Sequence, residues 1–149
     1  MRVEPPSSDD DSRWLTLRLR LWPQASVAEH LADMRASAAR GDCICIAMSA
    51  AGVLLGLAEA SMRTDYVNGT SGSPVPFLEG LYVEPDARRS GVARALVAAV
   101  GDWAMEHQAV ELASDALLDN TVSHAVHRAL GFVETERVVY FCKRLGSRR

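Results

Sequence analysis

The sequence has little of what a disulfide-stabilised, membrane-spanning or polyanion-binding protein needs. It has three cysteines, an odd number without the spacing of a disulfide scaffold, which favours reduced thiols. No apolar run approaches the roughly 18 residues of a membrane-spanning helix, and the acidic start has no apolar stretch of a secretion signal. The 16 basic residues are outnumbered by 19 acidic ones, which argues against nucleic acid as a partner. We therefore expect a cytoplasmic protein that binds neither membranes nor nucleic acid.

A metal centre is also not expected. Cys43 and Cys45 form a C-x-C pair inside an apolar run, without a histidine cluster nearby, so packing is a better interpretation than a metal or redox pair. His124 and His127 are three residues apart but lack a third ligand in their vicinity.

The length of 149 residues and the 48% of hydrophobic residues suit one domain over 1–149, with a polar and flexible start at 1–11. Ser26 and Glu29 have capping-box spacing for a helix that ends near Arg40, where Gly41 can stop it. The following elements are predicted along the rest of the chain: strands at Cys43–Met48, Val53–Met62 (with Gly56 as a bulge) and Phe77–Val83, a helix at Val92–His107, a strand-like run at Val110–Asp115, a helix from Asp119 or Asn120 to Leu130, and a strand at Phe132–Phe141. This order indicates an α/β or α+β sheet covered by helices.

Two segments are harder to interpret. From Ser12 to Leu21 every second residue after Trp14 is a leucine, which favours a strand, although Trp14, Leu17 and Leu21 also have helical spacing. The stretch 64–74 is rich in turn residues and too long for a simple connection, so it is expected to be a functional loop that carries Tyr66 toward solvent or ligand.

The most informative stretch runs from Leu81 to Ala93, where a strand leads through a basic, glycine-containing turn into a helix. The first N–H groups of a helix have no internal partners and lie at its positive end, so a phosphate is stabilised there. Gly91 lets the backbone approach such a ligand, and Arg88 and Arg89 add positive charge. The stretch is neither a P-loop nor a dinucleotide fingerprint. By itself it is equally consistent with a solvated basic turn.

Further along the chain, Asn120 and then V-H-R-A-L-G-F at 126–132 complete a pattern that begins with L-Y-V-x-P-x-x-R-x-x-G-V-A at 81–93. Together these motifs resemble the acetyl-CoA-binding core of the GNAT superfamily of N-acetyltransferases. The resemblance implies a single domain with a central mixed, mostly antiparallel sheet flanked by helices, and acetyl-CoA as co-substrate. The implied cofactor-binding residues are Leu81, Tyr82, Val83, Arg88, Arg89, Ser90, Gly91, Val92, Ala93 and Asn120.

The sequence departs from that pattern at two positions. Arg89 stands where the superfamily often has glycine, so its backbone must do without glycine's conformational freedom. His127 stands where the superfamily often has a tyrosine that is a candidate acid for the departing thiolate. A neutral histidine could donate a hydrogen bond there, or it could simply line the pocket.

A narrower resemblance covers nearly the whole chain. The segments that carry it are 21–23, 30–33, 65–69, 77–80, 113–115 and 134–138, and together they look like bacterial aminoglycoside 6'-N-acetyltransferases. This resemblance implies that Ser12–Leu21 is helical, which we adopt against the alternation, and it favours a homodimer. It implies an acceptor pocket with aromatic and acidic walls at Trp22, Tyr66, Glu79, Asp115 and Glu136.

These residue types suit such a substrate. An aminoglycoside is a small polycation, so converging carboxylates attract it and accept charge-assisted hydrogen bonds. Carboxylates also keep an amine protonated, whereas direct acetyl transfer in a ternary complex needs a neutral amine. We expect either Glu79 or Asp115 to take the proton of the 6'-ammonium, directly or through water. Each acid could instead be an ordinary surface charge.

Two other functions remain open at this point. The same acetyl-CoA-binding core could serve a polyamine, another metabolite amine or a protein N-terminus, since a fold does not determine its acceptor. The chain could also be a non-catalytic module that holds acetyl-CoA as a signal. The spaced carboxylates favour the polycationic sugar over a peptide acceptor.

Overall fold

The computed structural model describes residues 1–65, 67–72 and 74–146. The chain divides into two compact units, residues 1–115 and 116–149. The expectation that 1–149 forms one domain stays a prediction. The expected combination of helices with a mostly antiparallel sheet is confirmed.

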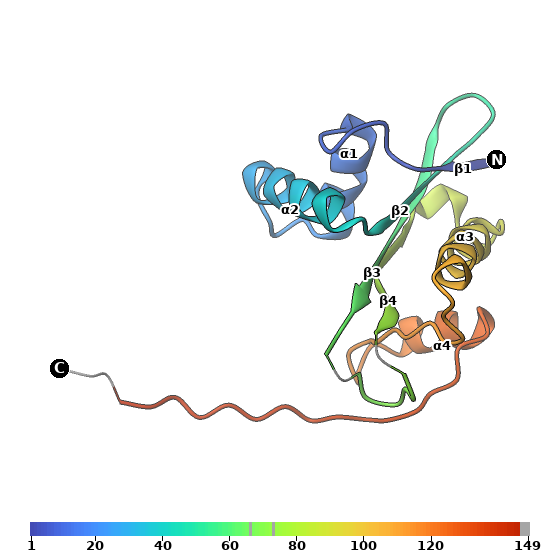
Figure 1. Cartoon of the computed structure of the whole chain (residues 1–149). Coiled ribbons are helices and arrows are strands. Elements are labelled where there is room, and N and C mark those ends of the chain that lie inside the picture. Colours follow the sequence, from blue (N-terminus) through green and yellow to red (C-terminus); the bar gives the residue numbers. More distant parts are fainter. Residues whose placement is uncertain (66, 73, 147–149) are drawn as a thin grey trace. The chain divides into compact units, whose positions relative to one another are not determined.

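The first unit contains a four-stranded antiparallel sheet in the order β1-β2-β3-β4 (Figure 1). The strands are β1 (Arg2–Glu4), β2 (Cys43–Met48), β3 (Leu54–Arg63) and β4 (Val75–Val83). Flexibility of the start 1–11 stays a prediction; within it, Arg2–Glu4 form a short strand that pairs with β2 at the edge of the sheet. A segment of three residues is too short for its alternation to reveal a strand.

Four α-helices and one 3₁₀ turn complete the described elements: α1 (Ser12–Leu21), α2 (Val27–Arg40), η1 (Pro85–Ala87), α3 (Val92–Glu106) and, in the second unit, α4 (Thr121–Ala129). The helix adopted for Ser12–Leu21 is confirmed, and Asp11 caps its first turn. The capping box at Ser26 and Glu29 is present at the start of α2. Gly41 ends α2 with a φ of 76°, a left-handed conformation that favours glycine.

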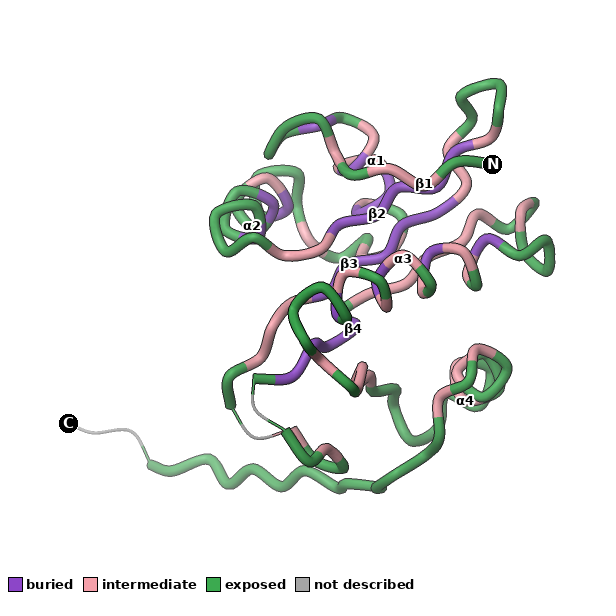
Figure 2. Tube along the Cα trace, turned by 45° about the vertical axis from the view of Figure 1, so that its right-hand side comes forward, coloured by how far each residue is buried: buried purple, intermediate pink, exposed green. Residues whose placement is uncertain are grey.

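Helices cover both faces of this sheet. On one face α1 and α2 pack against β2 and β3 around a core of Trp14, Leu17, Met34, Ile44, Ile46, Met48 and Leu57. α3 packs against β2, β3 and β4 and contributes buried residues such as Leu96 and Val100. Figure 1 shows α3 on the other side of the strands from α1 and α2, and Figure 2 shows that the buried residues concentrate on the central strands and the helix faces turned to them.

Two irregularities shape the sheet. The predicted bulge near Gly56 is confirmed by a register shift between β2 and β3, where Ala47 pairs with Gly56 but Met48 pairs with Leu54. A Cβ at Gly56 would lie 2.5 Å from the backbone oxygen of Tyr82, so this position has no room for a side chain. In β4 the register shifts at Glu79, which is an extra residue between two paired neighbours.

Two predicted strands have a different outcome. The run Val110–Asp115 forms an isolated parallel bridge, in which Ala113 pairs with Phe77 of β4. The strand predicted at Phe132–Phe141 is wrong for this structure, since the described residues 132–146 contain no strand. A strand needs a neighbouring chain segment for its backbone hydrogen bonds, and this segment is instead exposed, with Tyr140 at 87% and Phe141 at 92%.

Two searches of the described residues complete the description. None of the helices there is long and apolar enough to cross a bilayer. Within the same residues, no group of three or more histidine, cysteine or acidic side chains could hold a metal ion. Cys43, Cys45 and Cys142 are free thiols, and the sulfur atoms of Cys43 and Cys45 lie 3.6 Å apart.

Candidate active site

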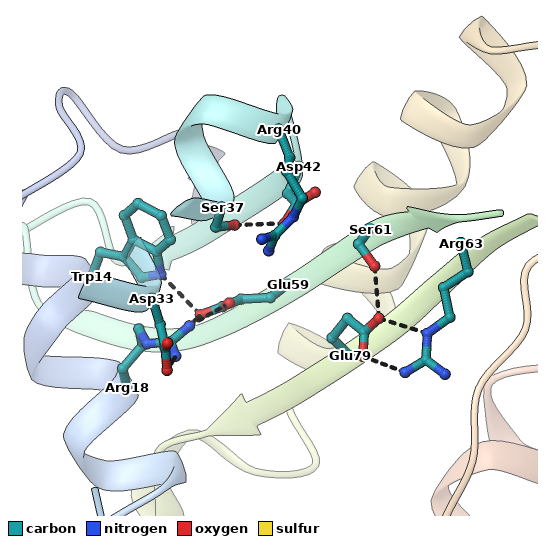
Figure 3. A network of polar contacts seen from close by, with 10 residues as sticks. All are labelled: Trp14, Arg18, Asp33, Ser37, Arg40, Asp42, Glu59, Ser61, Arg63 and Glu79. Atoms are coloured by element: carbon teal, nitrogen blue, oxygen red, sulfur yellow. Dashed lines mark hydrogen bonds and ion pairs between the residues drawn. The ribbon is translucent and has the colours of Figure 1, made fainter. Parts of the chain in front are cut away.

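A cavity of about 370 Å³ opens between helices α1 and α2 and strands β3 and β4. Trp22 lines it where α1 ends, and four acidic side chains surround it: Asp33, Asp42, Glu59 and Glu79. Figure 3 shows these carboxylates together with the arginines that bind them. Sequence analysis predicted Trp22 and Glu79 for one pocket, and the structure brings these two together.

Each cavity carboxylate already has an arginine partner. Arg18 binds Glu59 at 2.6 Å and Asp33 at 3.4 Å, and Arg40 binds Asp42 at 2.8 Å. Glu79 pairs with an arginine from the neighbouring strand, as described next. A cationic ligand must therefore compete with guanidinium groups for these oxygens.

Glu79 owes its position to the bulge in β4, and it forms a dense set of hydrogen bonds there. Oε1 accepts from Ser61 Oγ at 2.6 Å and from Arg63 Nε at 2.9 Å, and Oε2 accepts from the other guanidinium nitrogen at 2.7 Å. Burial would raise the pKa of Glu79, but the hydrogen bonds from Arg63 and Ser61 outweigh it and hold this pKa below the ordinary value. The carboxylate is therefore charged at neutral pH, which suits binding of an ammonium group better than removal of its proton.

Glu59 lies deeper and organises the inner wall of the cavity. Its carboxylate accepts hydrogen bonds from Trp14 Nε1 at 2.9 Å and from Arg18 at 2.6 and 2.7 Å, and both members of the ion pair are buried. Burial raises the pKa of Glu59, against the lowering effect of Arg18. Arg18 continues the network by donating to His30, which contacts the backbone of Trp22.

The outer edge of β4 is partly unpaired. Leu78 N–H donates to Ala113 O at 2.8 Å on this edge, whereas Glu84 N–H donates to Leu55 O on the β3 side. The bulge at Glu79 reverses the pattern after Leu78. Because hydrogen bonds alternate between the two edges from there to Glu84, the N–H groups of Leu81 and Val83 point to the outer edge. There β4 is the last strand of the sheet among the described residues. The predicted cofactor strand thus offers backbone donors to an extended ligand.

The turn that follows β4 has the geometry of an anion site. Gly91, with a φ of 87°, is the N-cap of α3, and within the described residues no side chain caps this helix. Arg89 has a φ of 61°, so it adopts the left-handed conformation that glycine adopts easily. This is the position where the superfamily often has glycine. Arg88 donates to Val83 O at 3.1 Å, which folds the turn back on β4, and Ser90 donates to Ala87 O. A turn of this kind could hold a diphosphate group.

Asp115 lies at the end of the first unit and is exposed. The parallel bridge pairs Ala113 with Phe77, and Asp115 follows Ala113 by two residues as Glu79 follows Phe77. This places the two predicted acids on neighbouring segments. Tyr66, the predicted aromatic wall, lies outside the described residues.

The second unit holds the remaining predicted residues. Asn120 caps α4 through its Oδ1, which accepts from Ser123 N at 3.1 Å. His127 Nδ1 lies 2.7 Å from Ser123 O. A carbonyl oxygen can only accept, so a neutral His127 carries its proton on Nδ1, which argues against proton donation from Nε2 to a thiolate. Glu136 is exposed in the extended segment that follows α4.

Comparison with known proteins places these features in a family. Residues 11–132 match the model of the acetyltransferase (GNAT) family. The chain belongs to this family. An aminoglycoside N(6')-acetyltransferase type 1 of Acinetobacter genomosp. 13 is 49% identical over 98% of this chain and 100% of its own length. A protein of the same name from Stenotrophomonas maltophilia is 49% identical over 89% of this chain and 86% of its own length.

Solved acetyltransferase structures share this fold. The apo aminoglycoside 6'-N-acetyltransferase AAC(6')-IG from Acinetobacter haemolyticus has a TM-score of 0.89 and 47% identity, and the alignment covers 98% of this chain and 100% of that one. AAC(6')-Iy in complex with the bisubstrate analogue CoA-S-monomethyl-acetylneamine has a TM-score of 0.89 and 43% identity, with 97% and 98% of the two chains covered. The family expected from the sequence motifs is confirmed.

Sequence analysis missed most of the charged side chains around this cavity, among them Arg18, Glu59 and Arg63, and it missed His30 behind them. Each of these four residues contacts a partner at least 12 residues away in the sequence, so no local sequence pattern could have indicated its role. The one available signal was Arg18 itself, a charged residue on the helical face of Trp14 and Leu17.

Proposed function

We propose that this acetyltransferase transfers an acetyl group from acetyl-CoA to the 6'-amine of aminoglycoside antibiotics. Full-length similarity to relatives that carry this activity in their names supports the proposal. The observation that carries it on this chain is the cavity beside Trp22, because its several carboxylates match the several ammonium groups of an aminoglycoside. Inactivation of these antibiotics is the expected consequence.

Acetyl-CoA supplies the acetyl group as an activated thioester. The turn at 88–93 and the uncapped start of α3 would hold its diphosphate, with Arg88 and Arg89 balancing the charge. Backbone donors of Leu81 and Val83 on the outer edge of β4 would pair with its extended arm and polarise the acetyl carbonyl. Asn120 is proposed as a further contact to this co-substrate.

The acceptor residues are proposed as Trp22, Tyr66, Glu79, Asp115 and Glu136. Trp22 and Glu79 line one cavity, which supports a shared role. We assign the general base to Asp115, since the hydrogen bonds to Glu79 make that carboxylate a weak proton acceptor. Asp115 takes a proton from the 6'-ammonium, and Glu79 holds a second ammonium group of the same substrate. His127 has no proton-donating role in this proposal.

An acceptor assay tests the proposal directly. Release of free thiol from acetyl-CoA is measured with tobramycin, with kanamycin, with spermidine and without acceptor. The proposal expects release only with the aminoglycosides, and NMR of the product should place the acetyl group on the 6'-nitrogen. Turnover with spermidine alone would instead identify an enzyme for another amine, and tight binding of acetyl-CoA without any turnover would identify a sensor.

We further propose that two copies of the chain associate. The run Val138–Phe141 has the β-branched and aromatic composition of a strand, yet it is exposed and without a strand partner in a single described chain. A second copy would supply backbone partners and would cover the apolar side chains.

The three free thiols also support a proposal that the enzyme works in the reducing cytoplasm, which cell fractionation would test.

A further inference from the structure

A row of buried polar groups crosses from the sheet to the end of α1. Glu59 of β3 binds Arg18 of α1, and Arg18 Nε donates to His30 Nδ1 of α2 at 3.1 Å. Glu59, Arg18 and His30 are 5%, 6% and 1% exposed. Buried ion pairs stabilise a fold weakly, because desolvation offsets their attraction, so stability alone does not account for this row.

The hydrogen bonds in this row have a fixed direction. A guanidinium group can only donate, so His30 Nδ1 must accept, and the ring proton lies on Nε2. Nε2 is 2.9 Å from the backbone oxygen of Trp22 and donates to it. The backbone N–H of Trp22 donates to Arg18 O at 2.8 Å. Trp22 is therefore held through both of its backbone polar groups by the same two residues.

The indole ring of Trp22 is held as firmly as its backbone. The Arg18 guanidinium lies 4.8 Å from the ring centroid on one side. Elsewhere the ring contacts Gly80 of β4, where a Cβ would lie only 2.7 and 2.8 Å from ring carbons of Trp22. The indole thus fits between a buried cation and the strand next to Glu79, and it lines the cavity with that carboxylate.

We propose that Arg18 and His30 are positioning residues that hold Trp22 as a rigid wall of the acceptor cavity and thereby determine which aminoglycosides bind. This inference rests on the proposed function, because it takes the cavity as the acceptor site. His30 lies behind the cavity wall, and the Arg18 guanidinium is engaged by Glu59 and Asp33. When the aromatic wall is already rigid, binding does not have to pay the entropy of ordering a large side chain. Loss of this rigidity should therefore weaken acceptor binding and leave the acetyl-transfer step unchanged.

The test compares His30→Leu with His30→Gln, whose amide can both accept from Arg18 and donate to Trp22. His30→Leu is expected to raise the KM for tobramycin about tenfold, as for one buried hydrogen bond, with kcat and the KM for acetyl-CoA unchanged within about twofold. His30→Gln should restore most of the binding. In a Trp22→Ala background, His30→Leu should add little, because the residue acts through Trp22.

Met34→Val is the matched control. Met34 lies one turn further along α2 and is fully buried in the core beside Trp14, so its substitution loosens the same helix without removing a bond to Trp22. The control should lower the melting temperature and leave the KM for tobramycin unchanged. If it raises this KM as much as His30→Leu does, or if the effects of His30→Leu and Trp22→Ala simply add, the positioning role is overturned.

A readout without substrate separates this inference from the proposed function. Acrylamide quenching of Trp22 fluorescence, obtained by subtracting the same variant with Trp22→Phe, should increase in His30→Leu and remain at the wild-type level in Met34→Val. A wild-type chain that acetylates no aminoglycoside refutes the proposed function, while the quenching data still report whether His30 holds Trp22. Unchanged quenching in His30→Leu overturns the positioning role even if the enzyme is active.

Discussion

At the scale of single residues, the pairing of Glu79 with Arg63 determines how the acceptor cavity receives a cation. The guanidinium binds both carboxylate oxygens and lies 3.5 Å from the ring centroid of Phe77. An ammonium group of the substrate must displace Arg63 or share Glu79 with it. In the proposed acceptor site, Arg63 would therefore compete with the substrate for Glu79 and weaken the binding of polycations.

Substitution of this competitor is expected to strengthen binding. Arg63→Met removes the guanidinium but keeps an apolar chain over Phe77, so the KM for tobramycin should fall about threefold and depend more steeply on salt. Steady-state kinetics at two salt concentrations measure both effects. Arg63→Lys, which retains a cation, should stay near the wild type. A higher KM in Arg63→Met would mean that Arg63 orients Glu79 for binding instead.

The two candidate acids are expected to separate kinetically. Glu79→Gln should raise the KM for kanamycin about tenfold with little change in kcat, because a binding charge is lost. Asp115→Asn should lower kcat by about 10² or more, as expected for a general base. Measurements of kcat and KM for both variants test the assignment. An intact kcat in both would make each carboxylate a binding group only.

At the scale of elements, the start of α1 depends on one charged cap. Asp11 accepts from the backbone and side chain of Arg13 and from Ser7, and the hydrogen bonds from Arg13 hold its pKa well below the ordinary value of 3.8. A lowered pKa means that the charge stabilises the fold above this ordinary value, and that the contribution is lost as the pH falls through the folded-state pKa.

Asp11→Asn keeps the shape of the cap and removes its charge. At pH 7 the free energy of unfolding should fall by about 1–2 kcal/mol. The difference from the wild type should shrink below about pH 4, because Asp11 takes up a proton in the unfolded chain there while it stays charged in the folded one. Urea unfolding between pH 3 and pH 7 measures this. A difference that is constant over the range would show that geometry rather than charge makes the cap.

The turn between β4 and α3 combines a strained backbone with a proposed cofactor contact. Arg89 adopts a positive φ at a cost of about 1 kcal/mol relative to glycine. Arg89→Gly and Arg89→Ala both remove the cation, so each should raise the KM for acetyl-CoA several-fold. Only glycine relieves the strain, so its variant should be about 1 kcal/mol more stable than the alanine variant. Equal stabilities in thermal unfolding would refute the strain.

The elements also show where sequence analysis succeeds. The capping box at Ser26 and the glycine after Arg40 are local signals, and the structure has the predicted helix between them. The alternating leucines of Ser12–Leu21 predict a strand by themselves, and only the resemblance to a family gave the helix. Arg18 misleads the pattern analysis, because a charged residue is expected to face solvent. It is buried here because it pairs with Glu59 of a distant strand. Such long-range pairs leave no periodic trace in the sequence.

At the scale of the whole molecule, the C-terminal segment is where sequence pattern and structure differ most. Its pattern predicts a strand, but the described residues 132–146 lack one, because strand formation depends on a partner that a single sequence does not reveal. The position of Glu136 could not be derived either, since it lies in an extended segment without a local pattern.

Association of two chains should therefore depend on this segment. Size-exclusion chromatography with light scattering is expected to give the mass of two chains for the wild type and of one chain for Phe141→Asp, because a buried charge opposes the interface. Val110→Asp changes another exposed valine, at 95%, and should leave the mass at two chains. A monomeric wild type would refute the homodimer.

Strand β4 carries proposed acceptor and cofactor residues within one short stretch. Glu79 faces the cavity, and two residues further Leu81 turns its N–H to the outer edge, so along the strand they are about 7 Å apart. An inhibitor that bears a cation at one end and an amide at the other could therefore bridge both with a linker of roughly five or six atoms. Such a compound would be far smaller than either proposed ligand. Mutations would have limited effect on its binding, because it would bind the peptide groups of the strand rather than its side chains.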